Sequence, residues 1–480
     1  MASENLPPHA IIFPFMAQGH TFPLLDLAKA LSFRGVKVTI ITTPSNAKQI
    51  SSFFTTKFSS TILTHVIPFP VVDGLLLGCE NTKELTSDNQ VLPFLRATLK
   101  LKQPFESYLR DLLEREDRPI CAICDFFLGW AITVCASFNI PGILFYGMGV
   151  LSTKINCTLY SNEEHMMTLV NGEKLEKLSP FPLILDDFSS LKDKNSPWMK
   201  FFQENDAGGA ISTCWGVLCN SFDELEGEFV RALEDFYGRS SVKVWCVGPL
   251  LLYEDGNIPK SSISNDRSNL YRSWLDEQHE RKEGVIYVSF GTQSQILKSQ
   301  MDEIALGLDL AGQRFIWVVR SSSWTPPEGW EERVKGRGIV IREWVDQRSI
   351  LAHPAIRGFL SHCGWNSVVE SLSMGVPILT WPMGADQSLN AKLVMHFLKA
   401  GLAMDPKLDE VQEDGVIYGC NAISSGVKEL MSGESGRLAR KRAEEIGLMA
   451  RNAVKKDGSS SKKLDHLINS LQEYSVLSDC

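Results

Sequence analysis

The chain has 480 residues, enough for two or three domains, and its 44% hydrophobic and 22% charged residues are ordinary for a globular protein with a sizeable core. Its 48 basic and 57 acidic residues give a formal net charge of -9. With no basic stripe to offset this charge, a nucleic-acid partner is not expected.

The cysteines and the first residues bear on the compartment of the protein. Most of the eleven cysteines lie in apolar runs, which is typical of buried thiols in a reducing environment. Cys121 and Cys124 form a lone C-x-x-C without a histidine at zinc-ligand spacing, so a chance pair on a buried strand is favoured over a metal or redox site. The start "MASENLPPHA" lacks a signal-peptide pattern, and no run approaches the ~18 apolar residues of a membrane span. We expect a cytoplasmic protein without membrane insertion.

Short apolar runs alternate with amphipathic segments through the first half of the chain. The runs are "AIIFPF", "VKVTIITT", "ICAIC" and "GILFY", and "PLLDLAKALSFRG" is one of the segments between them. Strands without internal alternation, separated by helical patterns, indicate a parallel sheet that is covered on both faces. Residues 160–210 are less regular, and we expect an excursion with short helices there.

The same alternation restarts after a polar stretch rich in Gly, Pro and Ser at residues 251–268, which has the composition of a linker. "GVIYVSFGTQS" reads as a strand and glycine turn, followed by a helix that Gly312 ends and by the strand "RFIWVV". The pattern predicts an α/β protein with two Rossmann-like, doubly wound parallel-sheet domains at 1–250 and 269–455. A final helix at 456–480 is expected to pack back on the first domain. Ligands of such sheets bind beyond the carboxyl ends of the strands, and the absence of G-x-G-x-x-G after either first strand argues against a dinucleotide cofactor.

The segment "GFLSHCGWNSVVESLSMG", residues 358–375, reads as a strand, a glycine turn and the start of a helix. Such a turn presents free backbone N–H groups and the positive end of the helix dipole, which together bind anions. His362, Asn366 and Ser367 add donors, so a diphosphate fits without a metal, and no D-x-D pair for a metal clamp occurs in the chain. Alternatively, Ser367 and Glu370 form a simple capping box.

Residues 344–387 carry the most specific motif, because "HCGWNS", "GVP", "WP" and "DQ" occur in them at fixed offsets. This stretch resembles the donor-binding signature box of plant family 1 UDP-sugar glycosyltransferases, and the resemblance extends over essentially the whole chain. It implies a GT-B fold with two domains across a cleft, the first for the acceptor and the second for the UDP-sugar. It also implies an inverting reaction without a metal or other cofactor, in which UDP-glucose is a co-substrate.

The resemblance assigns a role to each residue of the box. Trp344 would stack on uracil, although a core tryptophan is the alternative, and the Val345 backbone would bond the edge of the base. Gln347 and Glu370 would hold the ribose. The residues expected at the diphosphate are His362, Asn366 and Ser367, with Thr292 facing them, and those expected at the sugar are Trp365, Asp386 and Gln387. Gly364 is expected in the same UDP-sugar site. A terminal Gln in the box is associated with glucose donors in this family.

Two positions depart from the family pattern. Asp346 stands where the family usually has Pro, so the loop loses a φ constraint while Trp344 and Gln347 keep their spacing. Gly147 stands where the family often has Thr or Ser, whose hydroxyl would bond the sugar 6-hydroxyl. The resemblance therefore implies the UDP part of the donor more firmly than the identity of its sugar.

The Gly-His pair after the first strand supplies a candidate general base. A neutral imidazole suits proton removal at cellular pH, and His20 is expected at the end of that strand, with Gly19 giving room for the turn and Pro23 starting the helix. Asp125 follows "ICAIC" and is either a helix N-cap or, as the resemblance implies, the partner that orients His20. The other histidines are expected to be structural: His9, His65, His165, His279, His353, His396 and His466.

The resemblance implies a flat aromatic acceptor, a flavonoid or simpler phenolic, bound against Gly19, Phe126, Phe127 and Met148. Transfer to carbon or nitrogen stays open, since the same dyad can deprotonate a phenol whose ring carbon then attacks. A UDP-sugar epimerase and a non-catalytic nucleotide-sugar binder are weaker alternatives. A monomer is the default expectation.

Overall fold

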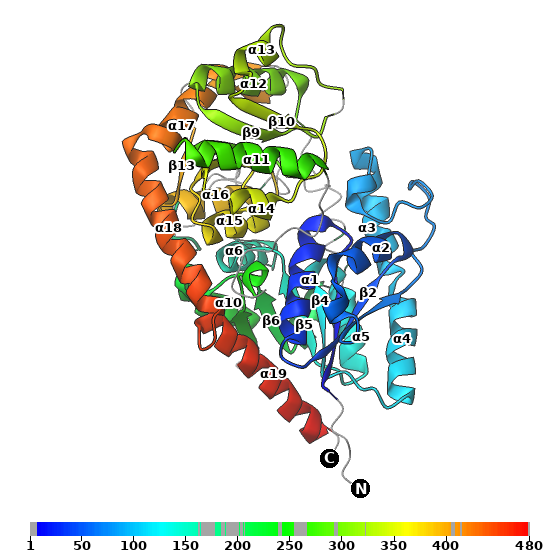
Figure 1. Cartoon of the computed structure of the whole chain (residues 1–480). Coiled ribbons are helices and arrows are strands. Elements are labelled where there is room, and N and C mark those ends of the chain that lie inside the picture. The colour runs from blue at the N-terminus through cyan, green and yellow to red at the C-terminus, as the bar shows by residue number, and fades with distance from the viewer. Residues whose placement is uncertain are drawn as a thin grey trace. The chain divides into compact units, whose positions relative to one another are not determined.

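A computed structural model describes residues 7–161, 164, 178–183, 188, 201, 205, 207–238, 242–253, 266–291, 296–321, 323–404, 409–412 and 415–478. The chain divides into two compact units (Figure 1). The first unit contains residues 1–175, 184–254 and 452–480, and the second contains residues 176–183 and 255–451. Most of the expected excursion at 160–210 and most of the expected linker lie outside the described residues.

The first unit is built on a seven-stranded sheet in the order β3-β2-β1-β4-β5-β6-β7, and all its strand pairs are parallel. Its inner strands are paired on both sides; Ile12, for example, lies beside Ile40 on one side and Ile123 on the other. The strands are β1 (His9–Phe13), β2 (Lys37–Thr42), β3 (Ile62–Val66), β4 (Cys121–Asp125), β5 (Gly142–Tyr146), β6 (Gly216–Cys219) and β7 (Lys243–Cys246).

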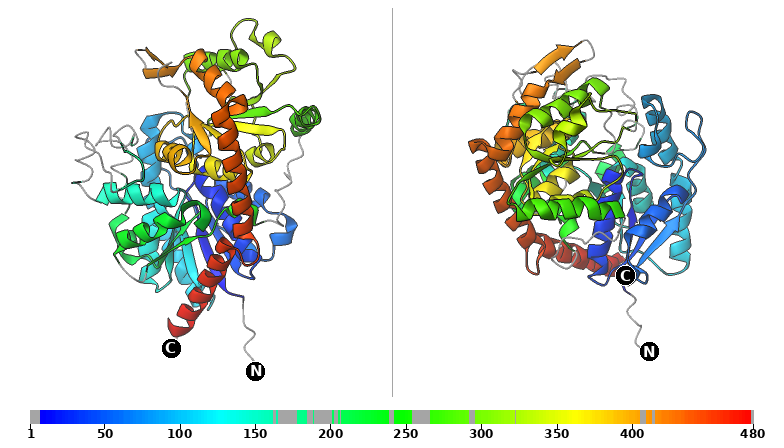
Figure 2. Two further views of the ribbon diagram at one scale, coloured as in Figure 1. Left: turned by 90° about the vertical axis from the view of Figure 1, so that its left-hand side faces the viewer. Right: turned by 45° about the horizontal axis from the view of Figure 1, so that its top comes forward.

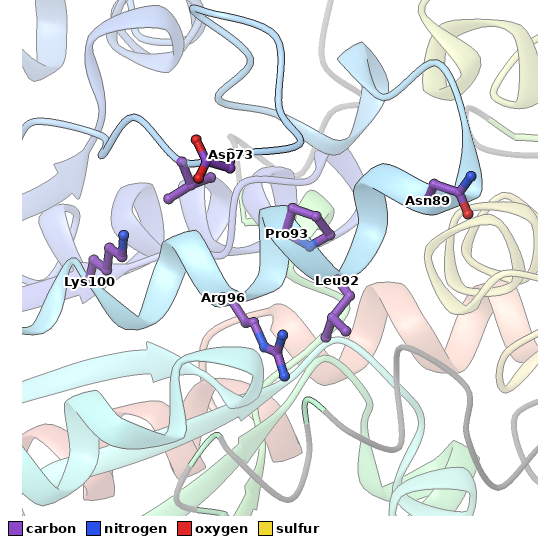
Figure 3. Close-up of a pocket in the computed structure, with 7 residues that line it drawn as sticks. Asp73, Asn89, Leu92, Pro93, Arg96 and Lys100 are labelled. Carbon is purple, nitrogen blue, oxygen red and sulfur yellow. The ribbon is translucent and has the colours of Figure 1, made fainter.

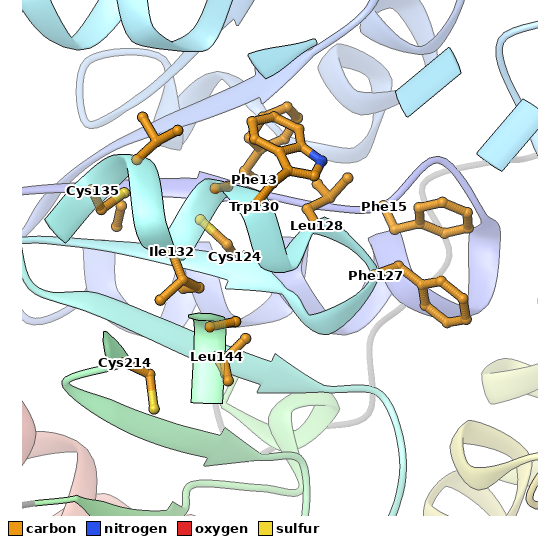
Figure 4. Packing of buried hydrophobic residues seen from close by; sticks show 14 of the residues in the cluster. Phe13, Phe15, Cys124, Phe127, Leu128, Trp130, Ile132, Cys135, Leu144 and Cys214 are labelled. Atoms are coloured by element: carbon orange, nitrogen blue, oxygen red, sulfur yellow. The ribbon is translucent and has the colours of Figure 1, made fainter. Parts of the chain in front are cut away.

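Helices cover both faces of this sheet. Alternate residues of each strand point to opposite faces, so each strand contributes side chains to two cores. Ile11 and Phe13 enter one core with Phe105 and Trp130, which Figure 4 shows in part, whereas Ile12 enters the other. The first core takes side chains of α3 (Val91–Leu99), α4 (Lys102–Glu114), α5 (Gly129–Ser137), α9 (Ala207–Thr213) and α10 (Asp223–Tyr237). The second takes side chains of α1 (Gln18–Ser32), α2 (Pro44–Phe53) and α19 (Ser459–Ser478).

The second unit repeats this architecture with six parallel strands in the order β10-β9-β8-β11-β12-β13. The strands are β8 (Val285–Ser289), β9 (Arg314–Val318), β10 (Gly338–Ile341), β11 (Ile356–Ser361), β12 (Ile378–Thr380) and β13 (Gly401–Ala403), and a hairpin adds β14 (Asp409–Gln412) and β15 (Gly415–Tyr418). The predicted class of two Rossmann-like doubly wound domains is confirmed.

The helices of the second unit begin and end at recognisable residues. Gly312 ends α12 (Lys298–Ala311) with φ +70°, as its position after the apolar pattern predicts. The remaining helices are α11 (Asp266–Glu280), α13 (Trp330–Val334), α14 (Gln347–Leu351), α15 (Trp365–Ser373), α16 (Gln387–Lys392), α17 (Cys420–Ser432) and α18 (Glu434–Val454). Within the described residues, no helix has both the length and the apolar character to cross a membrane.

The segment around the Gly-His pair differs from the expectation. β1 ends at Phe13 and α1 already begins at Gln18, so His20 lies in the first turn of the helix rather than at the end of the strand. Gly19 has no positive φ and Pro23 lies inside the helix, so neither makes the turn. The reversal is made earlier, where the Ala17 N–H donates to the Phe15 carbonyl at 2.8 Å.

Candidate functional site

In the first unit, His20 and Asp125 are joined by a hydrogen bond. His20 Nδ1 lies 2.8 Å from Asp125 Oδ2; the imidazole side chain is 23% exposed and the carboxylate is fully buried. With the proton held on Nδ1 by the carboxylate, Nε2 carries the lone pair that can accept a proton. Asp125 Oδ1 accepts the backbone N–H of Phe127 at 3.0 Å and so caps the short 3-10 helix Phe126–Leu128. Asp125 therefore serves both as an N-cap and as the partner of His20.

Three aromatic rings surround the imidazole. The ring centroids of Phe15, Phe126 and Phe127 lie 5.3, 5.9 and 5.1 Å from that of His20. Phe127 stacks on Phe15 at 4.8 Å (Figure 4), and Phe126 stacks on Tyr146 at 5.1 Å. The pair thus lies in an apolar environment, which strengthens its electrostatic interaction.

The segment after β5 also approaches His20. A Cβ on Gly147 would lie 3.7 Å from His20 Nδ1, an ordinary contact distance, so glycine is not required here for lack of space. Met148 is partly buried against the first core, and its sulfur accepts the Asn156 side-chain N–H at 3.6 Å. Among the four predicted acceptor residues, Phe126 and Phe127 contact His20, Gly19 precedes it in the helix, and Met148 lies one residue beyond Gly147.

A separate hollow in the first unit contains none of the predicted site residues. It has a volume of about 470 Å³ and lies between α3 and the loop before it (Figure 3). Its lining residues are Val72, Asp73, Asn89, Leu92, Pro93, Arg96 and Lys100.

In the second unit, the turn between β11 and α15 places His362 between two glycines. A Cβ on Gly291 would lie 2.7 Å from His362 Nε2, and one on Gly364 would lie 2.6 Å from it. Both positions therefore require glycine, because any side chain would clash with the ring. Burial, assisted by the positive charge of Arg320, lowers the pKa of His362 to about 4. His362 Nδ1 is buried and has no hydrogen-bond partner among the described residues. A neutral imidazole thus sits beside the helix N-terminus.

Gln347, Ser367 and Glu370 meet in one hydrogen-bonded cluster. Gln347 Nε2 donates to Ser367 Oγ at 2.9 Å and to Glu370 Oε2 at 2.8 Å. The capping-box interpretation of Ser367 and Glu370 is wrong, because the N-cap of α15 is Gly364 and Ser367 already lies in its first turn. Their side chains instead join α14 to α15.

Two members of this cluster were not predicted. Arg348 Nε lies 3.0 Å from Glu370 Oε1, and Tyr287 donates its hydroxyl to Gln347 Oε1 at 3.3 Å. Burial raises the pKa of Glu370, and the charge of Arg348 opposes that rise. The only feature of the sequence that could have indicated Arg348 is its place next to Gln347. Tyr287 lies within the apolar run "VIYVS", and nothing in that run indicates a contact with Gln347.

The remaining residues of the box lie near these helix starts. Trp344 is 48% exposed, which excludes the core interpretation, while Trp365 is buried as the first residue of α15. Val345 packs partly buried against the second unit's core, and Asn366 lies in the first turn of α15.

Asp386 and Gln387 lie at the start of α16. Gln387 Oε1 accepts the backbone N–H groups of Met383 and Gly384 at 2.8 and 3.1 Å, so its side-chain NH₂ is the part suited to a ligand. Asp386 Oδ2 accepts the Asn390 side-chain N–H at 2.8 Å. Thr292 lies outside the described residues. Over the part of the chain that is described, no group of three or more His, Cys, Asp or Glu could hold a metal ion.

Comparison with known proteins identifies the family. A family model described as "UDP-glucoronosyl and UDP-glucosyl transferase" matches residues 264–417, and one described as "Glycosyltransferase, N-terminal domain" matches residues 9–252. UDP-glycosyltransferase 90A1 of Arabidopsis thaliana is 37% identical, and the match covers 96% of each chain.

Two solved structures share the fold. That of Medicago truncatula UGT71G1 complexed with UDP-glucose is 27% identical, with a TM-score of 0.79 over 98% of this chain and 100% of the other. That of Phytolacca americana UGT2 complexed with UDP-2fluoro-glucose and pterostilbene is 25% identical, with a TM-score of 0.78 over 97% and 100%. The chain has the GT-B fold and belongs to the plant family 1 UDP-glycosyltransferases, enzymes that transfer a sugar from a UDP-sugar.

Proposed function

We propose that this enzyme is an inverting, metal-independent glucosyltransferase that moves glucose from UDP-glucose to a hydroxyl of a small aromatic acceptor, such as a flavonoid or another phenolic. The observation that carries the proposal is the 2.8 Å hydrogen bond between His20 and the buried carboxylate of Asp125. The family assignment favours transfer over the epimerase and the non-catalytic binder.

His20 Nε2 takes the proton of the acceptor hydroxyl while the oxygen forms a bond to the anomeric carbon. Asp125 holds the tautomer that leaves Nε2 free of a proton and stabilises the imidazolium that forms. The bond from the anomeric carbon to the diphosphate oxygen breaks in the same displacement, and UDP leaves with the electron pair. A single displacement from the opposite face inverts the anomeric configuration.

The donor is assigned to the second unit, beyond the carboxyl ends of its strands. Trp344 and Val345 take the uracil, and Gln347 and Glu370 take the ribose. The diphosphate lies at the N-terminus of α15, where backbone N–H groups and side-chain donors stabilise the charge of the leaving group without a metal. The residues assigned there are Thr292, His362, Gly364, Asn366 and Ser367, and those assigned to the sugar are Trp365, Asp386 and Gln387. The complex of Medicago truncatula UGT71G1 with UDP-glucose supports this donor.

The acceptor is assigned to the aromatic surroundings of His20. Phe126 and Phe127 present flat apolar surfaces within ring-contact distance of the imidazole, with Gly19 and Met148 beside them. Flat rings favour aromatic ligands through stacked or edge-to-face contacts. The complex of Phytolacca americana UGT2 with pterostilbene supports a small aromatic acceptor.

The test is a screen of phenolic acceptors with UDP-glucose, read by product mass, anomeric configuration and acid lability. We expect an acid-labile β-glucoside from the α-configured donor. His20→Gln should lower kcat within the roughly 10²–10⁴-fold range of general-base catalysis and leave the Kd of UDP unchanged. Asp125→Asn should also lower kcat, because the amide no longer holds the tautomer.

His466→Ala, an exposed histidine on α19, is the matched control and should turn over at the wild-type rate. Normal turnover by His20→Gln, or a product that retains the donor configuration, would contradict the mechanism. Loss of activity with a chelator would contradict metal independence, and an acid-stable hexoside would show C-transfer.

A further inference from the structure

The two residues that flank Gln347 carry opposite charges, and both act on Glu370. Arg348 Nε lies 3.0 Å from Glu370 Oε1, and the side chains of Arg348 and Glu370 are only 15% and 11% exposed. The other carboxylate oxygen, Oε2, accepts from Gln347 Nε2 at 2.8 Å. A carboxylate this buried stays ionised only with a cation and hydrogen bonds, and each oxygen keeps a lone pair for a further donor.

Asp346 takes the structural place of the family's usual proline by capping α14. Its φ is -76°, within the range of proline, and its Oδ1 accepts the Ser349 N–H at 3.5 Å. Its backbone carbonyl accepts the Ser349 hydroxyl at 2.9 Å and the Ile350 N–H at 3.3 Å. The bonds to its carbonyl would form equally with proline, so the contribution of the aspartate side chain is the long cap to the Ser349 N–H.

This replacement adds a second negative charge beside Glu370. Burial raises the pKa of Asp346, and the charge of Arg348 lowers it. The charge of Asp346 in turn raises the pKa of Glu370, which Arg348 again opposes. The phenols of Tyr271 and Tyr287 lie nearby and remain neutral because burial raises their pKa, and the charge of Arg320 opposes that rise at Tyr287.

We infer that Arg348 is a positioning residue of the donor site, which holds the Glu370 carboxylate in its ionised, ribose-accepting orientation and balances the charge that Asp346 introduces. Asp346 and Arg348 thus form a compensating pair, in which Arg348 is required because position 346 carries an acid. The inference rests on the proposed role of Glu370 at the ribose.

The test measures UDP binding by titration calorimetry with the full chain. Arg348→Gln should raise the Kd of UDP about tenfold or more, the scale of one charge-assisted hydrogen bond. The loss should grow as the pH falls, because burial raises the pKa of Glu370 and the variant lacks the cation that opposes this rise. The KM for UDP-glucose should rise while the KM for the acceptor and kcat at saturation stay unchanged. Arg281→Gln, which removes an exposed arginine from the same unit, should bind UDP like the wild type.

A double variant separates charge compensation from a merely structural role. Asp346→Pro alone should keep wild-type affinity. Asp346→Pro combined with Arg348→Gln should recover part of the affinity that Arg348→Gln loses, because it removes the repulsion from Asp346 while the direct Arg348 contact stays missing. Wild-type binding by Arg348→Gln at every pH, or no recovery in the double variant, would overturn the inference.

Two further results would bear on the inference. If circular dichroism shows that Arg348→Gln does not fold, Arg348→Lys takes its place. Lysine keeps the charge that balances Asp346 but loses the Nε contact, so it should raise the Kd of UDP without relief by Asp346→Pro, and an unchanged Kd refutes the inference. Failure of the wild type to bind UDP would contradict the proposed donor site itself.

Discussion

His362 shows how strongly a single position can be constrained by its neighbours. The glycines at 291 and 364 leave room for the ring, and burial lowers its pKa to about 4 from 6.5. As the pH falls below 6.5, the unfolded chain binds a proton at this histidine while the folded chain does not until about pH 4. The unfolded state therefore binds more protons in this window, and the stability of the second unit falls with falling pH.

The prediction at the residue scale is that His362→Asn flattens this pH dependence. Between pH 7 and pH 4, wild-type stability should decrease by up to about 3 kcal/mol more than that of the variant. Urea denaturation followed by circular dichroism across this range measures the difference. Parallel curves for the two proteins would show that His362 does not titrate with a lowered pKa.

Sequence reasoning at the residue scale paired His20 with Asp125 from their places after two parallel strands and from the family resemblance. The two residues are 105 positions apart, and the structure joins them at 2.8 Å. It missed Arg348 and Tyr287 because their contacts depend on how α14 and β8 pack, which no local pattern encodes. It also placed His20 at a strand end, since the sequence does not show that the chain turns at Phe15–Ala17 before the helix starts.

At the scale of elements, the buried carboxylate of Glu226 holds the start of α6 (Val150–Ser161), the helix that follows Gly147 and Met148. Glu226 on α10 accepts the backbone N–H groups of Val150 and Leu151, both at 3.0 Å, and the Ser221 hydroxyl at 2.7 Å. Val150 and Leu151 begin α6, directly after the segment of Gly147 and Met148. Glu226 therefore caps α6 from another helix, a connection that the sequence pattern did not reveal.

Glu226→Ala should destabilise the first unit, because it leaves two buried N–H groups without an acceptor. The expected loss is about 2–6 kcal/mol in the free energy of unfolding, since each of the two unsatisfied donors costs about 1–3 kcal/mol. Glu226→Gln keeps one acceptor oxygen and should lose less. Urea titration of the three proteins measures this order, and equal stabilities would show that the cap contributes nothing.

At the scale of the whole molecule, the chain passes between its two units four times. Residues 176–183 belong to the second unit, where Lys392 Nζ donates to the Pro182 carbonyl at 2.8 Å, and residues 452–480 return to the first. The alternation of apolar and amphipathic segments predicted both sheets, because the pattern that indicates each strand or helix lies within that segment of the sequence. It did not predict that residues 176–183 belong to the second unit, since so short a segment shows no periodic pattern from which its packing partner could be inferred.

The chain returns to the first unit through α19, the red helix of Figure 2, which contributes four buried apolar side chains to that unit: Leu464, Leu467, Ile468 and Leu471. Its polar residues also bind the first unit, where Lys463 pairs with Asp223, Asp465 pairs with Arg34, and the Ser460 hydroxyl donates to the Gly248 carbonyl. The helix thus completes the second core of the first unit.

Leu467→Ala should therefore destabilise the first unit and leave the donor site intact. Removing a fully buried leucine leaves a cavity, and we expect a loss of about 2–5 kcal/mol in the free energy of unfolding of that unit. The Kd of UDP should stay at its wild-type value, because every residue assigned to the nucleotide belongs to the second unit. Lys462→Ala, exposed on the same helix, is the control for altering α19 without touching the core. Urea unfolding and calorimetry on the same samples separate the two effects, and a weakened Kd with unchanged stability would mean that α19 acts on the donor site instead of on the core.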